Sequence, residues 1–540
     1  MTEISPAQAR DARRFFPRQA TGLTREVSWI DAMFYNLLWS SLPLSLAFIL
    51  AYDPALYSSA NPYIAVLAAL VLTLPCALMY AMFSSAIPRS GGDYTWITRS
   101  LSPSVGFMSS LSFCAWITFF IGVYSDYLGT YGIAPMLRIL AADTQSRGLL
   151  DTANWFTTET GAIVVGLVVV VGSALLLTLG AGLRTFMKLQ KGAFALWALG
   201  AVALPIVLML FISKATFISN FNTYILHLGG PSNAYSKFVA SAPANNSPTT
   251  FSGSLLMVTL PFYTLGFIFQ SAYFGGEIKR ARKTALRSIV VAELLAAGLL
   301  LVGIVVFRAH LSQFLYATGA GDYTKIGLSS APQYPEIAAI ASGNAVVGTL
   351  ISIGMIMVFL TWIPQSMLLL SRSLFAWSFD RLLPAKVASV NSRTRSPAVA
   401  VGLIAVLSVG AVLLVGLSPS LTFVVGLMGL TFTYVLVSIA GIAFPYRQKE
   451  TFEASPFNRR IGRLPVMTLV AVVSTVAVAI IIVILLRDKN SGTSWDLNKF
   501  RVELSLGILL AGFIVYQVIK LIQKARGVDV ELAYREIPPE

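Results

Sequence analysis

Twelve long apolar runs constrain the fold of this chain more than any other feature of its sequence. Each is close to the roughly 20 residues that an α-helix needs to cross the hydrocarbon core of a bilayer. A backbone in lipid must satisfy its own hydrogen bonds, so such runs form helices. The runs cover residues 30–51, 63–83, 103–131, 161–183, 187–211, 255–274, 286–309, 345–370, 397–416, 421–444, 464–486 and 502–522. We predict an all-α integral membrane protein with twelve transmembrane helices.

The charged residues fall between these runs. Only 12% of the residues are charged, and the formal net charge is +15. With the N-terminus in the cytoplasm, 29 of the 39 Lys and Arg residues lie in inner segments, as the positive-inside rule requires. The excess of Lys and Arg therefore reflects membrane topology. It predicts that both termini are cytoplasmic in a multi-pass protein of the plasma membrane. No nucleic-acid partner is expected.

Cysteine and histidine placement argues against redox and metal chemistry. Cys76 and Cys114 lie inside apolar runs, and His227 and His310 lie in or beside polar segments. These positions offer neither a disulfide framework nor the paired ligands of an intramembrane haem or metal site. A phosphate-binding G-x-x-x-x-G-K-[ST] loop is also missing from the sequence. We expect no cofactor, no metal and no enzymatic activity.

Three long polar segments separate the runs on the outer side. They are predicted to be loops, with room for short helices, and cover residues 132–160, 212–254 and 310–344. The triplet Asn245-Asn246-Ser247 in the second of them fits a glycosylation sequon, although such triplets also recur by chance.

Helices one and six carry interruptions in matching places. Ser40 and Thr264 each lie eleven residues after the start of their halves, at Trp29 and Gly253. Proline removes a backbone donor and clashes with the preceding turn, and Pro43 stands in the first helix as Pro261 does in the sixth. Transporters built from inverted repeats hold substrate at such interrupted helices. The alternative, that these residues are ordinary in a membrane helix, applies better to one helix than to a matched pair.

An unwound backbone near the bilayer centre needs polar partners, and an amino acid zwitterion can supply both signs. The helix end that faces the gap with its N–H groups favours a carboxylate, and the opposite end favours an ammonium group. Helix three adds an aromatic face, Trp116, Phe120 and Tyr124, which either walls a pocket or packs as core. The predicted substrate-binding residues are Asn36, Ser40, Ser41, Leu42, Trp116, Phe120, Tyr263, Thr264 and Gly266.

Three segments on the predicted cytoplasmic face resemble the amino acid, polyamine and organocation (APC) permease family. Residues 88–94 read Pro-Arg-Ser-Gly-Gly-Asp-Tyr, similar to the family's Pro-x-Ser/Ala-Gly-Gly-x-Tyr. Residues 276–284 contain its Glu-x-Lys-x-x-x-Arg pattern in part, without the usual prolines. Residues 371–384 resemble its Ser-Arg-x-x-x-Ala-x-x-x-Asp-x-x-x-Pro stretch. Helix one departs from the family because it has no glycine in residues 38–45.

The resemblance implies a LeuT-type 5+5 inverted repeat with two extra C-terminal helices. The expected parts are a cytoplasmic N-terminal segment (1–28), two five-helix repeats (29–212 and 253–445), helices eleven and twelve (464–522) and a cytoplasmic tail (523–540). A cytoplasmic gate is expected from Glu277, Lys279, Arg372 and Asp380, whose charges can form exchangeable ion pairs. Each single charge is otherwise an ordinary positive-inside or surface residue.

Two further residues are candidates for ion coupling. In this fold class sodium is held by backbone carbonyls of helix one and hydroxyls of helix eight, and Thr361 is the available hydroxyl. Glu293 lies about seven residues, or roughly 10 Å, inside its helix. An ionisable residue at that depth is either part of a proton pathway or makes a structural hydrogen bond to a neighbouring helix.

These observations predict a permease that moves an amino acid or related organic amine by alternating access, coupled to Na⁺ or H⁺. The bilayer and this small molecule are the expected partners. The alternative is a sensor or channel with the same fold and without coupled turnover. A membrane enzyme is disfavoured because catalytic residues do not cluster at either membrane face.

Overall fold

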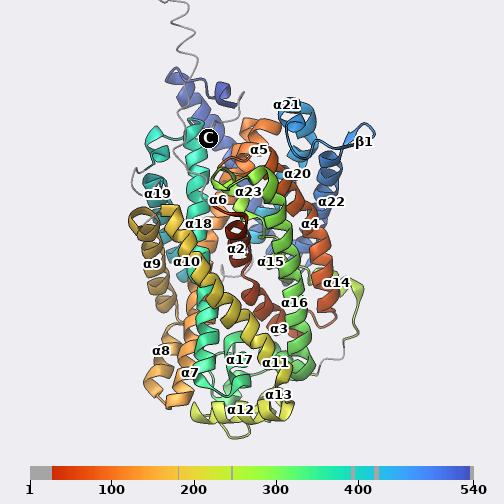
Figure 1. Cartoon of the computed structure of the whole chain (residues 1–540). Helices are drawn as coiled ribbons and strands as arrows, with labels where there is room; N and C mark the ends of the chain where they lie inside the picture. The colour runs from red at the N-terminus through yellow and green to blue at the C-terminus, as the bar shows by residue number, and fades with distance from the viewer. Residues whose placement is uncertain (1–26, 181, 245–246, 391–395, 419–424, 535–540) are drawn as a thin grey trace, which may run out of the picture.

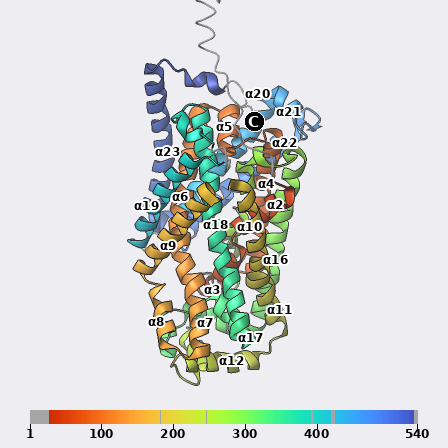
Figure 2. The same ribbon diagram turned by 60° about the vertical axis from the view of Figure 1, so that its left-hand side comes forward.

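The computed structural model describes residues 27–180, 182–244, 247–390, 396–418 and 425–534. It is an elongated helical bundle (Figures 1 and 2). The first half contains α2 (Trp29–Trp39), α3 (Leu42–Leu56), α4 (Pro62–Ala86), α5 (Asp93–Ser100), α6 (Pro103–Tyr127), η1 (Leu128–Ile133), α7 (Ala134–Thr144), α8 (Arg147–Trp155), α9 (Glu159–Leu175), η2 (Leu176–Gly180), α10 (Gly182–Leu196), η3 (Trp197–Ala203) and α11 (Leu204–Phe211).

The second half begins with two short helices at one end of the bundle and continues with a divided sixth span. Its elements are α12 (Lys214–His227), α13 (Ala234–Ser241), α14 (Phe251–Leu256), α15 (Thr259–Leu265), η4 (Gln270–Tyr273), η5 (Gly275–Glu277), α16 (Ala281–Ala320), η6 (Tyr323–Ile326), α17 (Tyr334–Ser342), α18 (Ala345–Phe379), η7 (Ala385–Ala388), α19 (Ala398–Gly416), α20 (Val425–Arg447), α21 (Lys449–Glu453), β1 (Arg460–Ile461), β2 (Leu464–Pro465), α22 (Val466–Arg487), α23 (Trp495–Ala525) and η9 (Val530–Tyr534). The strands β1 and β2 form one short antiparallel hairpin.

Within the described residues, eleven helical segments are long and apolar enough to cross a membrane. They correspond to every predicted run except the sixth. The sixth run is helical only in short pieces, and its longest apolar helical stretch, Phe251–Leu265, is too short to span by itself. The predicted count of twelve spans is therefore not confirmed at this position, where the span that the sequence predicted to be interrupted is divided into short helical pieces.

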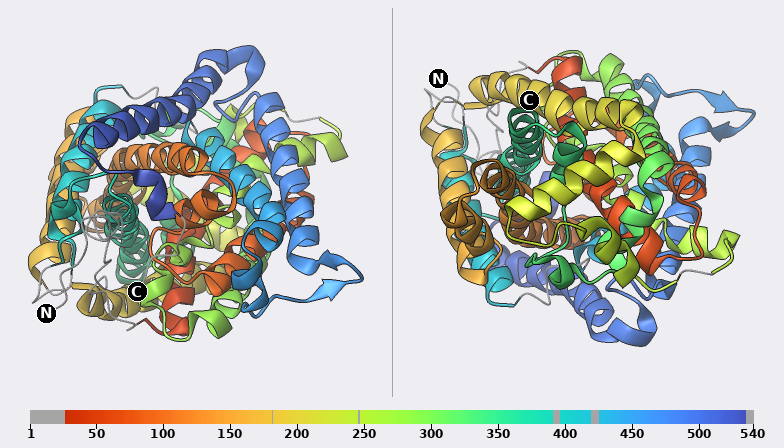
Figure 3. Two further views of the ribbon diagram at one scale, coloured as in Figure 1. Left: turned by 90° about the horizontal axis from the view of Figure 1, so that it is seen from above. Right: turned by 90° about the horizontal axis from the view of Figure 1, so that it is seen from below.

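The first span lies inside the bundle. In the apolar window of α2 and α3, 89% of the residues are buried, against 28% for α23 and 33% for α9. Views along the long axis show α23, in dark blue, along one edge of the bundle (Figure 3). A span without a lipid-facing surface is free to carry polar residues, because neighbouring helices rather than lipid surround it.

The three long polar segments contain the short helices for which the sequence left room. Residues 132–160, 212–254 and 310–344 include α7, α8, α12, α13 and α17, and α12 lies across the lower end of the bundle (Figures 1 and 2). Ser146 and Ser213 cap α8 and α12, their hydroxyls accepting from the amides of Leu149 and Thr216. Such caps satisfy orphan amides and favour short amphipathic helices over loops. The sequon residues Asn245 and Asn246 lie outside the described residues.

Candidate functional site

The first span breaks between α2 and α3, at Ser40 and Ser41. Ser41 adopts a left-handed conformation with φ of 50°, which ends the regular helix because L-residues rarely hold it. Pro43 follows within the first turn of α3, where its missing N–H costs no hydrogen bond. The break predicted from Ser40 to Pro43 is thus present, and the proline starts the second half-helix.

The sixth span breaks later than its proline suggested. Pro261 lies in the first turn of α15, which ends at Leu265 with Gly266 as its C-cap. Helical geometry returns only as the 3₁₀ turn η4. The Gly266 carbonyl at the end of α15 accepts a hydrogen bond of 2.8 Å from the hydroxyl of Tyr434 in α20. The interruption therefore lies between Gly266 and Gln270.

A side chain of α2 joins the two interrupted spans. Asn36 Oδ1 accepts a hydrogen bond of 2.9 Å from the backbone amide of Ser271 in η4. The hydroxyl of Tyr35, next to Asn36, donates to the Gln365 carbonyl of α18 at 3.0 Å. Asn36 was predicted to bind substrate, and the structure places it between the two breaks.

An aromatic cluster covers the first break. The Tyr124 ring stacks on Trp362 with a centroid separation of 3.9 Å, and its hydroxyl donates to Ser41 Oγ at 3.0 Å. Trp39 contacts the other side of this cluster, 5.1 Å from Trp362. Phe120 meets both Trp362 and Phe267 edge to face. The helix-three face thus lies over the break, and the aromatic rings close it.

Trp362 was missed in the sequence, although it is the centre of this cluster. It lies between Thr361 and Pro364, which were noticed only for their hydroxyl and their kink. An aromatic residue beside a helix-breaking proline in an interior span is the signal that could have identified it.

Two other predicted binding residues pack elsewhere. The Trp116 indole lies against Gly429 of α20, where an added Cβ would come within 1.9 Å of Nε1. Tyr263 meets Phe48 of α3 edge to face at 6.0 Å. Leu42 is buried at the first position of α3, and the Ser40 hydroxyl donates to the carbonyl of Leu37 in its own helix.

Polar atoms at the breaks are left over after these contacts. Among the described residues, Asn36 Nδ2, Trp39 Nε1 and Thr264 Oγ1 are buried and have no hydrogen-bond partner. A buried donor or acceptor without a partner costs on the order of 1–3 kcal/mol. With both side-chain polar atoms of Gln270, which also have no partner among the described residues, five such atoms lie beside the two breaks, where a polar guest can satisfy them.

The two residues considered for ion coupling have different surroundings. The Thr361 hydroxyl donates to the Met357 carbonyl of its own helix at 2.7 Å. Glu293 is fully buried in α16, and its Oε1 accepts a 2.6 Å hydrogen bond from the hydroxyl of Thr73 in α4. The sequence did not indicate a hydrogen-bond partner for Glu293. The structure provides Thr73, which lies 220 residues away on a neighbouring helix.

Glu277 and Arg372 form a buried, bidentate ion pair at the end of the sixth span that follows its break. Arg372 Nε donates to Glu277 Oε1 at 2.9 Å, and Nη2 donates to Oε2 at 3.0 Å. Their side chains are 2% and 1% exposed. The pair joins η5 to α18. Planar two-point pairing of this kind is the strongest form of Arg–carboxylate contact.

Asp380 pairs with a residue that the sequence did not single out. Arg99 of α5 donates to both Asp380 oxygens, at 2.7 and 2.8 Å, and both side chains are buried. Tyr94 adds a hydrogen bond of 2.9 Å to the same carboxylate. The Lys279 side chain is exposed, and its backbone amide donates to the Val27 carbonyl. Two buried ion pairs therefore lie at this end of the bundle, with Lys279 outside them.

Asp93, the variable position of the diglycine motif, is a further buried acid at this end. Tyr273 of η4 and Tyr80 of α4 donate hydrogen bonds to its carboxylate. Burial raises the pKa of Asp93 to about 7, although the hydrogen bonds from Tyr273 and Tyr80 act in the opposite direction. Gly91 and Gly92 before it both have positive φ, which explains the diglycine.

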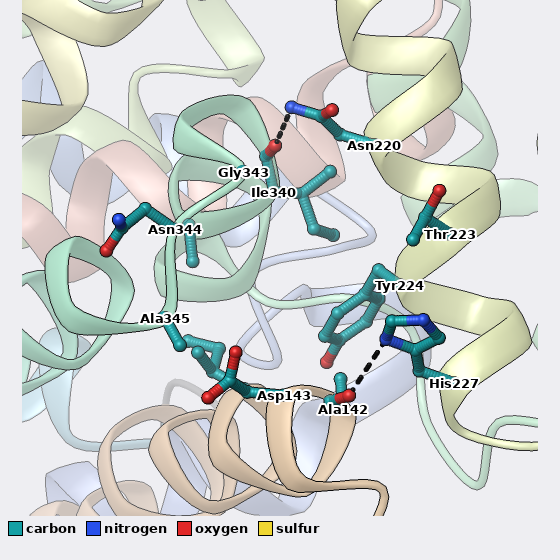
Figure 4. A pocket seen from close by; sticks show the side chains of 12 residues that line it. Ala142, Asp143, Asn220, Thr223, Tyr224, His227, Ile340, Gly343, Asn344 and Ala345 are labelled. Carbon is teal, nitrogen blue, oxygen red and sulfur yellow. Dashed lines mark hydrogen bonds between the residues drawn. The ribbon is translucent and has the colours of Figure 1, made fainter.

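The opposite end of the bundle has its own buried charges and a small cavity. Arg308 of α16 pairs with Asp53 of α3, and Arg138 of α7 pairs with Glu336 of α17. A cavity of about 180 Å³ lies between α7, α12 and α17. Figure 4 shows His227 bonded to the Ala142 carbonyl at its edge. This cavity is lined by residues remote in sequence from both breaks.

The family model for amino acid permeases matches residues 32–510. This chain belongs to the amino acid permease family. The family consists of transporters of amino acids, so membership indicates a multi-pass membrane transporter with a small-molecule substrate. No curated protein matches the chain. The resemblance drawn from the three cytoplasmic motifs is thereby confirmed at the level of the family.

Proposed function

We propose that this permease is a secondary active transporter that moves an amino acid or a related organic amine by alternating access. The observation that carries the proposal is the pair of adjacent helix breaks with unsatisfied polar atoms, Asn36 Nδ2 and Thr264 Oγ1, buried beside them. A ligand with hydrogen-bonding groups at both ends satisfies atoms that the protein leaves without partners.

The two breaks differ in electrostatic sign. Ser41 provides no side-chain cap for α3. Pro43 has no N–H and the Leu44 amide donates to the Ser41 carbonyl at 2.9 Å, so the Leu42 amide is the one that the first turn leaves for a ligand. This amide and the positive end of the α3 dipole favour a carboxylate. The C-termini of α2 and α15 present carbonyls, which favour an ammonium group. In the proposal the serine backbone of helix one replaces the glycine-rich carboxylate site typical of the family.

In this proposal the protein is closed on the cytoplasmic side. Glu277–Arg372 and Arg99–Asp380 join η5 and α5 to α18 at that end. Tyr124 and Trp362 cover the first break. We propose that the two ion pairs separate when the inner pathway opens, and that water then hydrates the four charges, which offsets the lost attraction.

The proposal includes the finer architecture. Residues 29–212 and 253–445 are the two inverted repeats of a LeuT-type core, and residues 464–522 form two extra helices. The breaks in corresponding positions of the two halves support this. Both termini are proposed to be cytoplasmic in the plasma membrane. For coupling, Glu293 is the proposed proton site and Thr361 the proposed sodium ligand.

Binding and transport are tested with the purified full chain. In a thermal-shift screen of amino acids and polyamines, a true substrate raises the unfolding temperature by mass action. Ser41→Ala and Thr264→Ala are expected to abolish that shift. Thr475→Ala is the matched control, because its hydroxyl donates only to the Ala471 carbonyl of its own helix, α22. An unchanged shift in both test variants would place the site elsewhere.

Transport is then measured in liposomes with imposed Na⁺ and pH gradients. A carrier exchanges labelled for unlabelled substrate in counterflow, whereas a sensor that shares the fold only binds. Absence of uptake of every amino acid and amine that gives a thermal shift, under all gradients, would refute the transporter and leave the sensor.

A further inference from the structure

A large basic cavity lies at the cytoplasmic-gate end of the bundle, outside the proposed pathway. Its volume is about 940 Å³, and it lies between the end of α4, the start of α16 and the helix α21. Arg89, Arg280, Arg282 and Lys283 line it, with Glu450 as the single acidic residue in the lining. The lining therefore carries a formal charge of +3.

The start of α16 adds to this positive field. Arg280 is the N-cap of this 40-residue helix, has a φ of 55° and provides no side-chain cap. Within the first turn the Lys283 amide donates to the Arg280 carbonyl at 2.8 Å, which leaves the amides of Ala281 and Arg282 for another acceptor. The positive end of the helix dipole lies beside the cavity. Arg280, Arg282 and Lys283 form no ion pair with any described residue.

The cavity lies where two candidate membrane spans meet their ends. The candidate spans of α4 and α16 end and begin at Ala86 and Ala281, both of which line it. Exposed large apolar side chains on α16 begin at Val291, ten residues or roughly 15 Å after Ala281. A lipid whose chains lie along α16 thus has its headgroup within reach of the basic lining.

We propose that this cavity binds the phosphate group of an anionic membrane lipid. Guanidinium groups and free helix-terminal amides both match phosphate oxygens, and a basic pocket at the inner ends of membrane helices suits an anionic headgroup.

The test compares lipids on the full chain in neutral detergent, with binding read by native mass spectrometry and thermal shift. The variant is Arg280→Gln/Arg282→Gln/Lys283→Gln, and the control is Lys386→Gln/Arg463→Gln/Lys524→Gln, which removes three exposed cations outside the cavity. Each basic residue near an anionic surface contributes about fivefold, so the variant should bind phosphatidylglycerol at least tenfold more weakly. The control should bind like the wild type.

Phosphatidylcholine tests whether binding depends on the net charge of the lipid headgroup, and inorganic phosphate tests whether a free anion binds as well as the lipid. Stronger binding of phosphatidylglycerol than of phosphatidylcholine, lost in the variant alone, supports the proposal. Equal binding of phosphatidylglycerol by the variant and the control overturns it, as does inorganic phosphate that stabilises the protein as well as the lipid does. Arg282→Gln alone serves if the triple variant does not fold. Uptake is measured separately, so failure here leaves the transporter proposal untouched.

Discussion

The buried Glu277–Arg372 pair gives the sharpest energetic prediction. Both side chains are at most 2% exposed, so solvent screens their attraction little. Glu277→Gln leaves the Arg372 guanidinium buried without a countercharge and places an amide N–H₂ against one of its donors. Removing one partner of such a pair costs about 3–5 kcal/mol. We expect a loss near the lower end, about 3 kcal/mol, because the amide oxygen still accepts one hydrogen bond.

A double variant separates the effect of the unpaired charge from that of the side chains around it. Glu277→Leu/Arg372→Met removes both charges and replaces them with apolar side chains of similar length. Because this also removes the desolvation cost, the double variant should recover most of the loss and approach wild-type stability. Unfolding is followed by tryptophan fluorescence in detergent under denaturant.

The control is the exposed pair Lys449–Glu453, whose side chains are 71% and 54% exposed at a separation of 4.0 Å. Glu453→Gln should change stability by less than about 0.5 kcal/mol. The reasoning is refuted if Glu277→Gln is as mild as Glu453→Gln, or if the double variant is no more stable than the single one.

Two further predictions follow from the same contacts. Asp93 has a pKa raised to about 7, so its protonated form stabilises the fold at low pH. That contribution is full below its usual pKa near 4 and is lost as pH rises to about 7. Asp93→Asn should remove up to about 4 kcal/mol of this change in the free energy of unfolding between pH 4 and pH 7. The measurement is the free energy of unfolding of the variant and the wild type at each pH, and two parallel pH profiles would contradict the prediction. Gly354→Leu should destabilise the bundle by about 1–3 kcal/mol or more, because an added Cβ lies 2.4 Å from the Ala201 amide nitrogen. Gly402→Leu is the control, with nothing within 4 Å of its Cβ, and equal effects on the unfolding midpoint would argue against close packing of α18 on η3.

The sequence located the first break well and the second one only approximately. Ser40, Ser41 and Pro43 fall at the observed interruption of the first span. In the sixth span Pro261 drew attention, but a proline in a first helical turn is tolerated, and the chain unwinds after Gly266 instead. Residue types with low helix propensity indicate that a helix is easily interrupted. Where it is interrupted depends on contacts with other helices, such as the hydrogen bond from the Tyr434 hydroxyl to the Gly266 carbonyl.

Hydrophobic periodicity along the chain does not predict which residues on different helices form hydrogen bonds or ion pairs with each other. The sequence singled out Asp380 and Glu293 as buried or functional charges, yet Arg99 and Thr73 became their partners only through folding. Trp362 was likewise unseen, although it meets Tyr124 from a helix more than 200 residues away.

What the sequence determined by itself is the membrane, the number of apolar runs and the family motifs, whereas the orientation inferred from charge placement stays a prediction. These follow from hydrophobic length and charge placement, which act locally along the chain. The tertiary structure decided which charges pair, which aromatic rings cover the first break and which polar atoms at the two breaks stay without a partner. Those outcomes depend on distances between spans that packing alone sets, because a hydrogen bond or ion pair forms only when both groups reach a few ångströms of each other.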